Sequence, residues 1–119
     1  MITKKEHLIE YFKSGIKNTN EFKIGIEHEK FLFDINTNKR VDYQTVLKMF
    51  GALCEFGWKP ILENDNVVGL KKNGKSITLE PGNQIELSGD KLNNMHEACS
   101  ESQDYLFELN QVIKKLNLK

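Results

Sequence analysis

Apolar residues recur at three- and four-residue steps in two long stretches, the pattern of helices with one buried face. The first stretch follows Asp42, a suitable N-cap, and runs to about Phe56, with Gly57 at its end. The second runs roughly from Leu92 to Leu116. The positions expected to face inward are Val46, Leu47, Phe50, Leu53 and Cys54 in the first helix, and Leu92, Met95, Cys99, Leu106, Leu109, Ile113 and Leu116 in the second.

A shorter helix is predicted near the N-terminus. Thr3 and Glu6 have the spacing of a capping box, and Leu8, Ile9 and Phe12 form an apolar stripe behind them. The Ser-Gly dipeptide two residues after this stripe should end the helix.

Alternation of polar and apolar residues, together with turn residues, predicts the strands. A long strand is expected from about Phe22 to Ile35. Four short strands follow the second helix, at about Trp58–Glu63, Val67–Lys71, Ser76–Glu80 and Gln84–Leu87, separated by NDN, KNGK and PGN. Strands this close together must form antiparallel hairpins, because a parallel crossover needs about a dozen residues or more.

The predicted order is therefore helix, strand, helix, four strands and a long helix, in a single domain that spans residues 1–119. We predict an α+β fold, in which helices pack on one face of a largely antiparallel sheet of about five strands. Because the helices can share one face, the other face of the sheet stays available for polar function.

Composition and charge exclude several classes of protein. The 17 basic residues equal the 17 acidic ones, so no general basic field would attract nucleic acid. No apolar run approaches the ~20 residues of a membrane helix, and the charged N-terminus is unlike a signal peptide. The two cysteines, Cys54 and Cys99, are far apart, which favours free thiols in a reducing compartment. These observations predict a cytoplasmic protein.

The stretch KIGIEHEKFLF places Glu27 and Glu29 on one side of the long predicted strand. Glutamate is depleted in strands, and two neighbouring carboxylates raise the pKa of one of them unless a cation is present. A hard divalent ion such as Mg²⁺ or Mn²⁺ is the natural partner of convergent carboxylates. The alternative is a solvated pair on an edge strand, which is the commoner case for such a pattern.

A second acidic segment, SITLEPGNQIELSG, contains Glu80 and Glu86. A simple four-residue turn at Glu80–Asn83 would place these two glutamates on different faces of the hairpin, whereas a bulge or a wider loop would bring them together. Spacing alone leaves both arrangements open, and Glu80 can also be an ordinary turn residue.

Other polar residues have simpler interpretations. His28 lacks a second histidine at zinc-motif spacing, so it is interpreted as a strand-face residue with at most an indirect role. The lysines of KKNGK are expected at a solvated hairpin tip, with phosphate contact as the alternative. Cys54 and Cys99 fall on the apolar stripes of helices, which favours buried, inert thiols.

Three longer stretches are distinctive: FKIGIEHEKFLF, GWKP…NVVGLKKNGKSITLEPGNQIELSG and NMHEACSE. They closely resemble the N-terminal part of plant-type glutamate–cysteine ligase, a family that also occurs in proteobacteria. The resemblance covers most of the chain, from about Phe22 to the end. The string LEPG-x-Q-x-ELSG is long and specific, and its distance after G-x-EHEKF strengthens the match.

The resemblance implies a partial catalytic domain similar to that of glutamine synthetase, in which a G-x-E-x-E strand and a later E…Q-x-E segment hold the catalytic metals. Carried over by position, Glu27, Glu29, Glu80 and Glu86 would bind Mg²⁺ or Mn²⁺. This implies that Glu80 and Glu86 converge, through a bulged or irregular connection. Gln84 would orient the substrate or a ligand through its amide.

The family joins the γ-carboxylate of glutamate to the amine of cysteine, through a γ-glutamyl phosphate made from ATP, in the first step of glutathione synthesis. The expected partners are therefore glutamate, cysteine and ATP, with no nucleic acid and no membrane. Plant members also have disulfide-based redox regulation, and Cys99 lies where one of those cysteines would be, with its partner outside this chain.

Family members are several times longer than this chain, whose single arginine, Arg40, cannot clamp both ATP and two amino acids. We therefore expect an N-terminal portion that is inactive alone and that self-associates through an unpaired sheet edge. The alternatives are a non-catalytic module that binds a divalent metal or a partner, a ligase that uses another amine, and a remnant with solvated glutamates.

Overall fold

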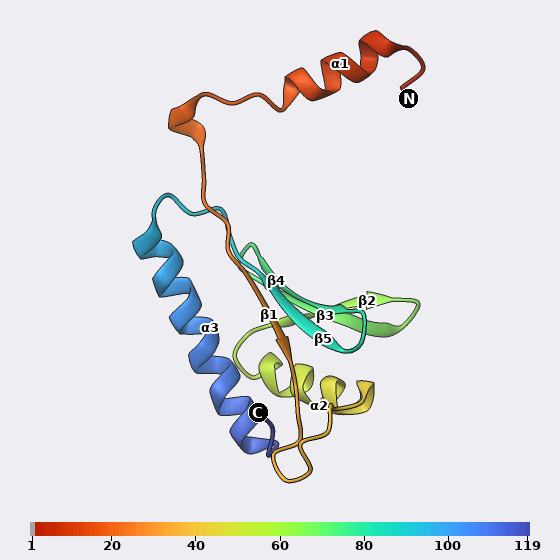
Figure 1. Cartoon of the computed structure of the whole chain (residues 1–119), viewed down its shortest axis with the longest axis vertical. Helices are drawn as coiled ribbons and strands as arrows, with labels where there is room; N and C mark the ends of the chain where they lie inside the picture. The colour runs from red at the N-terminus through yellow and green to blue at the C-terminus, as the bar shows by residue number, and fades with distance from the viewer. Residues whose placement is uncertain (1) are drawn as a thin grey trace.

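The structure is a computed structural model that describes residues 2–119. Its elements follow the predicted order, with one added 3-10 turn (Figure 1). They are the helix α1 (Lys5–Ser14), the turn η1 (Thr19–Glu21), the strand β1 (Glu27–Phe31), the helix α2 (Tyr43–Cys54), the strands β2 (Lys59–Glu63), β3 (Asn66–Lys72), β4 (Lys75–Glu80) and β5 (Gln84–Ser88), and the helix α3 (Met95–Lys115).

The five strands form one antiparallel sheet in the order β1-β5-β4-β3-β2. The strands β2 to β5 pair as consecutive hairpins, as their short separators require. The first strand, β1, lies at one edge and pairs with β5, which is distant in sequence. The two acidic segments of the sequence therefore become neighbours. This confirms the predicted α+β fold and leaves β1 and β2 at the two edges.

The strand β1 is shorter than the predicted strand from Phe22 to Ile35, because its flanks pair with other segments. Before β1, Ile24 forms an isolated bridge with Leu92. After β1, Phe33 exchanges backbone hydrogen bonds with Lys119, and Asp34 bridges Leu118. The extended run is thus continuous, but only its centre belongs to the sheet, and the C-terminal residues lie along the end of β1.

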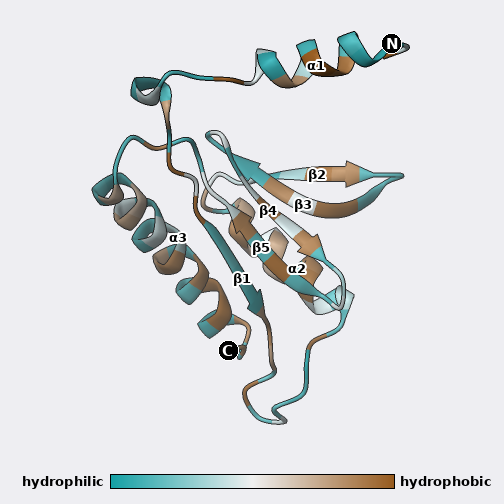
Figure 2. Ribbon diagram, turned by 45° about the horizontal axis from the view of Figure 1, so that its top comes forward, coloured by the Kyte–Doolittle hydropathy of each residue, from teal (hydrophilic) through white to brown (hydrophobic). Residues whose placement is uncertain are grey.

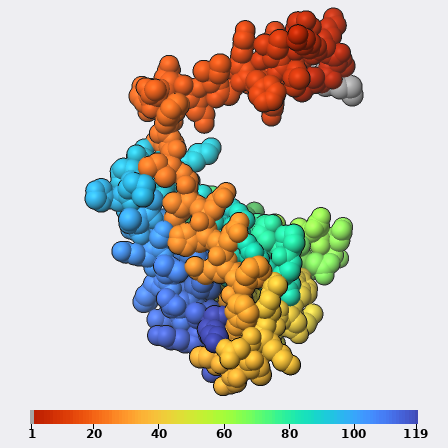
Figure 3. Space-filling model, in the orientation of Figure 1, coloured from red at the N-terminus to blue at the C-terminus, as the bar shows by residue number. Residues whose placement is uncertain are grey.

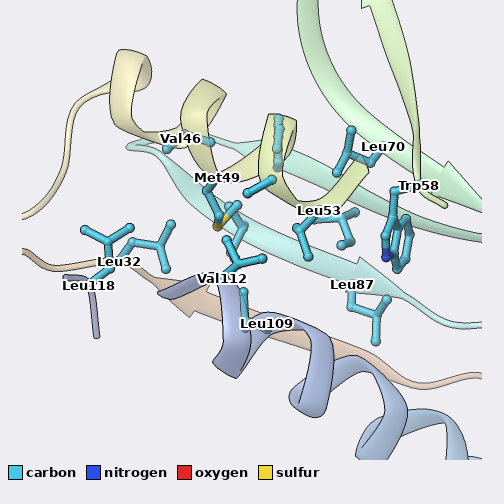
Figure 4. Packing of buried hydrophobic residues seen from close by; sticks show 14 of the residues in the cluster. Leu32, Val46, Met49, Leu53, Trp58, Leu70, Leu87, Leu109, Val112 and Leu118 are labelled. Atoms are coloured by element: carbon cyan, nitrogen blue, oxygen red, sulfur yellow. The ribbon is translucent and has the colours of Figure 1, made fainter. Parts of the chain in front are cut away.

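The helices α2 and α3 cover one face of the sheet, and the hydrophobic core lies between them and the strands (Figure 4). Asp42 caps α2 as predicted, because its carboxylate accepts a hydrogen bond from the Thr45 amide at 2.9 Å. Hydrogen bonds from Thr45 hold the pKa of Asp42 below its usual value. The sheet supplies the fully buried residues Leu70, Ile77, Ile85 and Leu87 to this core.

The helix α1 forms where predicted but packs on nothing. Figures 1 and 3 show it standing apart from the rest of the chain, and α1 has no buried residue. Its apolar stripe is exposed, with Phe12 70% accessible. The expected Thr3 cap is absent, since Lys4 is the N-cap residue and no side chain caps the helix. The radius of gyration, 17.9 Å, exceeds the ~13 Å of a compact 100-residue domain for this reason.

The inner face of α3 agrees with the predicted one in its second half, where Leu109 is buried and Leu106, Ile113 and Leu116 pack against the core, and it differs in the first half. The buried residues are Ala98, Glu101, Tyr105, Leu109 and Val112, whereas Met95 is exposed. The helix also begins later than predicted, after the N-cap Asn94. Cys99 is exposed and Cys54 half-buried, and both are free, so the expectation of a buried thiol is wrong for Cys99. Within residues 2–119, no helix is long and apolar enough to span a bilayer.

Two lysines of the β3–β4 hairpin pair with carboxylates of α3, contrary to the solvated tip that we expected, whereas Lys71 is exposed. The Lys72 ammonium lies 2.5 Å from the Glu108 carboxylate, which also accepts a hydrogen bond from the Trp58 indole at 2.7 Å. The Lys75 ammonium lies 3.8 Å from the carboxylate of Glu101, whose side chain is only 7% exposed. Two lysines of this hairpin are therefore fixed inside the helix–sheet interface.

Candidate metal centre

The sheet face opposite α2 and α3 is called the open face here. In an antiparallel sheet, directly paired residues point to the same side, so the register defines this face. One row consists of Glu27, Ser88, Ser76, Lys71 and Lys59, and the next of Glu29, Glu86, Thr78, Gly69 and Ile61. A third row consists of Phe31, Gln84 and Glu80. All four predicted glutamates and Gln84 therefore share the open face, and Figure 2 shows β1 as largely hydrophilic.

The connection between β4 and β5 brings Glu80 and Glu86 to the same side. Glu80 pairs with Gln84, so the loop contains three residues, Pro81, Gly82 and Asn83. Gly82 and Asn83 both have positive φ values, 75° and 59°, which glycine and asparagine tolerate best. The wider loop that the sequence left open is thus the one adopted, and the pairing after it is regular.

The four carboxylates differ in exposure and in their hydrogen-bond partners. Glu27 and Glu29 are exposed, whereas Glu80 and Glu86 are half-buried. The Gln84 amide donates to Glu29 at 2.6 Å, the Thr78 hydroxyl donates to Glu80 at 3.2 Å, and the Ser88 hydroxyl donates to Glu86 at 3.2 Å. None of the four forms an ion pair within residues 2–119. The cluster therefore contains four carboxylates without a basic partner.

The four carboxylates are spaced more widely than the ligands of a formed metal site. Across the described chain, no three acidic, histidine or cysteine side chains are grouped closely enough to hold a metal ion. Glu29 and Glu86 are direct cross-strand partners, with Cβ atoms expected ~5 Å apart, and Glu80 is a diagonal neighbour of Glu86. Rotation of these long side chains would be needed to bring their oxygens around one ion. The donor set, all hard carboxylate oxygens, fits Mg²⁺ or Mn²⁺.

Gln84 and His28 occupy opposite sides of the sheet. Gln84 is on β5, between β1 and β4, and its amide donates a hydrogen bond to Glu29, so it can position that carboxylate. His28 pairs with Leu87 on the inner face, and its ring lies 6.2 Å from the Tyr105 ring in an edge-to-face contact. Burial raises the pKa of Tyr105, whose hydroxyl has no partner. His28 is therefore a strand residue of the inner face, as the sequence predicted.

Arg40 lies at the border of the site, although its place in the sequence predicted only a turn. Its guanidinium lies 4.1 Å from the centre of the Phe31 ring. It also adjoins the β4–β5 loop, where a β-carbon added to Gly82 would lie 3.0 Å from it. The only arginine of the chain is thus beside the third row of the open face. No local pattern signals this position, because it results from pairing between segments distant in the sequence.

Comparisons with known proteins agree with the resemblance seen in the sequence. Residues 23–119 match glutamate-cysteine ligase family 2. The chain is 37% identical over 115 residues to the chloroplastic glutamate–cysteine ligases of Arabidopsis thaliana and Nicotiana tabacum. It is 39% identical over 115 residues to the chloroplastic glutamate–cysteine ligase A of Oryza sativa subsp. japonica. In each case the alignment covers 96% of this chain.

The same relatives correct the predicted location and show how much of a full-length protein this chain represents. Each is described as chloroplastic, which contradicts the cytoplasmic location expected from the sequence. The chain spans only 22% of the Arabidopsis protein and 23% of the Oryza protein. The family model nevertheless matches every residue of the sheet and of the helices that cover it. The chain therefore belongs to glutamate-cysteine ligase family 2.

Proposed function

We propose that this chain is the metal-binding N-terminal portion of an ATP-dependent glutamate–cysteine ligase, which makes γ-glutamylcysteine in the first step of glutathione synthesis. One observation carries the proposal: four glutamates from three strands share the open face, and none has a basic partner within residues 2–119. Membership of the family and the names of the relatives support the reaction.

The residues that would hold the divalent metals are Glu27, Glu29, Glu80 and Glu86. When bound there, Mg²⁺ would neutralise phosphate charge and so favour transfer of a phosphoryl group from ATP to a carboxylate. The chain's own contribution is to orient the ligands: Gln84 restrains Glu29, while Thr78 and Ser88 restrain Glu80 and Glu86. The glutamates act as ligands in this proposal, not as nucleophiles.

The rest of the machinery would adjoin the acidic edge of the sheet. Glutamate, cysteine and ATP together present several anionic groups, and arginines are the usual partners of such groups. Among the described residues the open face has one arginine at its border, Arg40. The C-terminal residues pair with the segment just after β1, so protein added after Lys119 would start beside the C-terminal end of that strand. The edge strands β1 and β2 would pair with it or with a second copy, which supports the proposed self-association.

The proposal predicts that Mg²⁺ or Mn²⁺ stabilises the 119-residue chain. A ligand present at 100 times its Kd adds about 2.7 kcal/mol to the free energy of unfolding if it binds only the folded state. Thermal melting in millimolar metal should therefore show a raised Tm, and the double variant Glu29→Gln/Glu86→Gln should lose the shift.

The matched control is Glu55→Gln/Glu63→Gln, which removes two glutamates outside the four-residue cluster and should retain the shift. Calcium chloride and sodium chloride at equal ionic strength separate selective binding from screening. An equal metal-induced shift in the parent and in the Glu29→Gln/Glu86→Gln variant would show that the cluster is not the site.

The reaction itself is tested by phosphate release that depends on ATP, glutamate and cysteine together. We expect no turnover by the 119-residue chain and measurable turnover after fusion to the downstream portion of a chloroplastic relative. Glu86→Gln in the fused protein should reduce kcat by about 100-fold or more, the size of a lost electrostatic contact to a transferring group. Turnover by the unfused chain would contradict the proposed dependence on further protein.

A further inference from the structure

The end of the open face farthest from the acidic strands is basic. Lys59 of β2 and Lys71 of β3 are direct cross-strand partners, and both are exposed. Like charges placed directly opposite one another destabilise a sheet, so a bound anion would relieve the repulsion within this pair. Neither lysine forms an ion pair with a carboxylate of residues 2–119. Like the glutamate cluster, this pair consists of like charges on the open face that have no oppositely charged partner among residues 2–119.

A pocket lies beside this pair. Its volume is about 440 Å³, within the range of small-molecule sites, and its lining includes Lys59, Lys71, Ser76 and the hairpin residues Asn73 and Gly74. The other two lysines that line it, Lys72 and Lys75, are already paired with Glu108 and Glu101. The pocket therefore keeps the charge of two lysines without carboxylate partners, on a rigid hairpin that the paired lysines anchor to α3.

We propose that the pocket between Lys59 and Lys71 binds a compact phosphate-bearing anion. Lysine is a common phosphate ligand, acting as a point charge with three donors, and a phosphate chain offers several acceptor oxygens to two such groups. The Ser76 hydroxyl occupies the next position of the same row and can donate to the same anion. A bound phosphate would offset the repulsion between the two ammonium groups.

The pocket is separate from the candidate metal centre. Glu27 and Lys71 lie at positions of one row that are three strand spacings apart, about 14 Å at ~4.8 Å per spacing. The carboxylates on the same face repel an extended polyanion, which favours a small ligand over a nucleic acid. The inference stands on the lysines alone, and it does not require that the carboxylates bind a metal.

The test uses sodium triphosphate as the probe, titrated into the full 119-residue chain in EDTA so that no divalent metal takes part. Isothermal calorimetry and amide chemical shifts should show saturable binding, with the largest shifts in β2 and in the β3–β4 hairpin. Lys59→Gln/Lys71→Gln should weaken binding about tenfold or more. Because the variant removes a repulsive pair, its Tm should equal or exceed that of the parent, so lost binding will not reflect unfolding.

The control variant, Lys13→Gln/Lys114→Gln, removes the same charge from α1 and α3 and should bind triphosphate as the parent does. Glu29→Gln/Glu86→Gln should also retain binding in EDTA, which separates this site from the metal centre. Equal affinity for ATP and triphosphate would show that the phosphate chain is the recognised group, whether free or nucleotide-borne. Equal weakening by both lysine variants, or unchanged binding in Lys59→Gln/Lys71→Gln, would overturn the proposal.

Discussion

Replacement of Phe50 by alanine is expected to lower the free energy of unfolding by about 3–5 kcal/mol. Phe50 is 1% exposed, in α2, and belongs to the core between the helices and the sheet. Its loss removes buried apolar surface and leaves a cavity that the close-packed neighbours cannot fill. A domain is stable by only about 5–15 kcal/mol, so urea denaturation should show a large drop in the midpoint.

The same substitution at Phe12 is the matched control. Phe12 lies on α1, is 70% exposed, and α1 contributes no buried residue. Phe12→Ala should therefore change the free energy of unfolding by no more than about 0.5 kcal/mol. A comparable loss in both variants would mean that α1 packs against the chain in solution, in conflict with the arrangement in Figure 1.

The substitution Lys75→Met should cost about 3 kcal/mol, the scale of breaking a buried ion pair by removing one partner. It leaves the Glu101 carboxylate, 7% exposed, with the Asp90 amide as its remaining donor, at 3.2 Å from each oxygen. Methionine keeps most of the side-chain length, so the loss reflects the missing charge more than lost packing. Chemical denaturation at neutral pH gives the measurement.

A second substitution distinguishes charge from shape. The double variant Lys75→Met/Glu101→Gln has no buried charge at this position, and the side-chain amide oxygen introduced by Glu101→Gln can still accept a hydrogen bond from the Asp90 backbone amide. At least half of the stability lost in Lys75→Met should therefore return. A cost below about 1 kcal/mol for Lys75→Met alone would place this pair in the class of exposed surface ion pairs. That result would contradict the buried position of Glu101.

The strands and their common polar face were predictable because period-two alternation and turn residues are local signals. The placement of Glu80 and Glu86 on the same face could not be predicted from local signals, because it depends on the exact number of residues in the loop between them. Adding or removing a single residue between β4 and β5 moves one glutamate to the other side of the sheet. Local pattern therefore identified the ligand candidates, and the pairing of β1 with β5 placed them on one face of neighbouring strands.

The predictions for the first half of α3 and for two lysines of the β3–β4 hairpin failed for one shared reason. Hydrophobicity selected Met95 and Cys99 there, whereas that part of the helix buries Glu101 and Tyr105. A buried glutamate becomes acceptable only with a partner, and that partner is a lysine from a hairpin interpreted as solvated. Neither residue reveals the pairing by itself, since each resembles a surface residue until the two segments are brought together.

Because α1 packs against no other element, it lies outside the part of the chain that should unfold as one cooperative unit. Among residues 2–119, all the buried ones come after position 31, and the family match begins at residue 23. Segments that share no buried surface unfold independently, so α1 should lose its structure without changing the stability of the remainder. A helix of 10 residues without packing is marginal in water. The cooperative folding unit is therefore the sheet with its two covering helices, and substitutions in α1 should leave the stability of that unit unchanged.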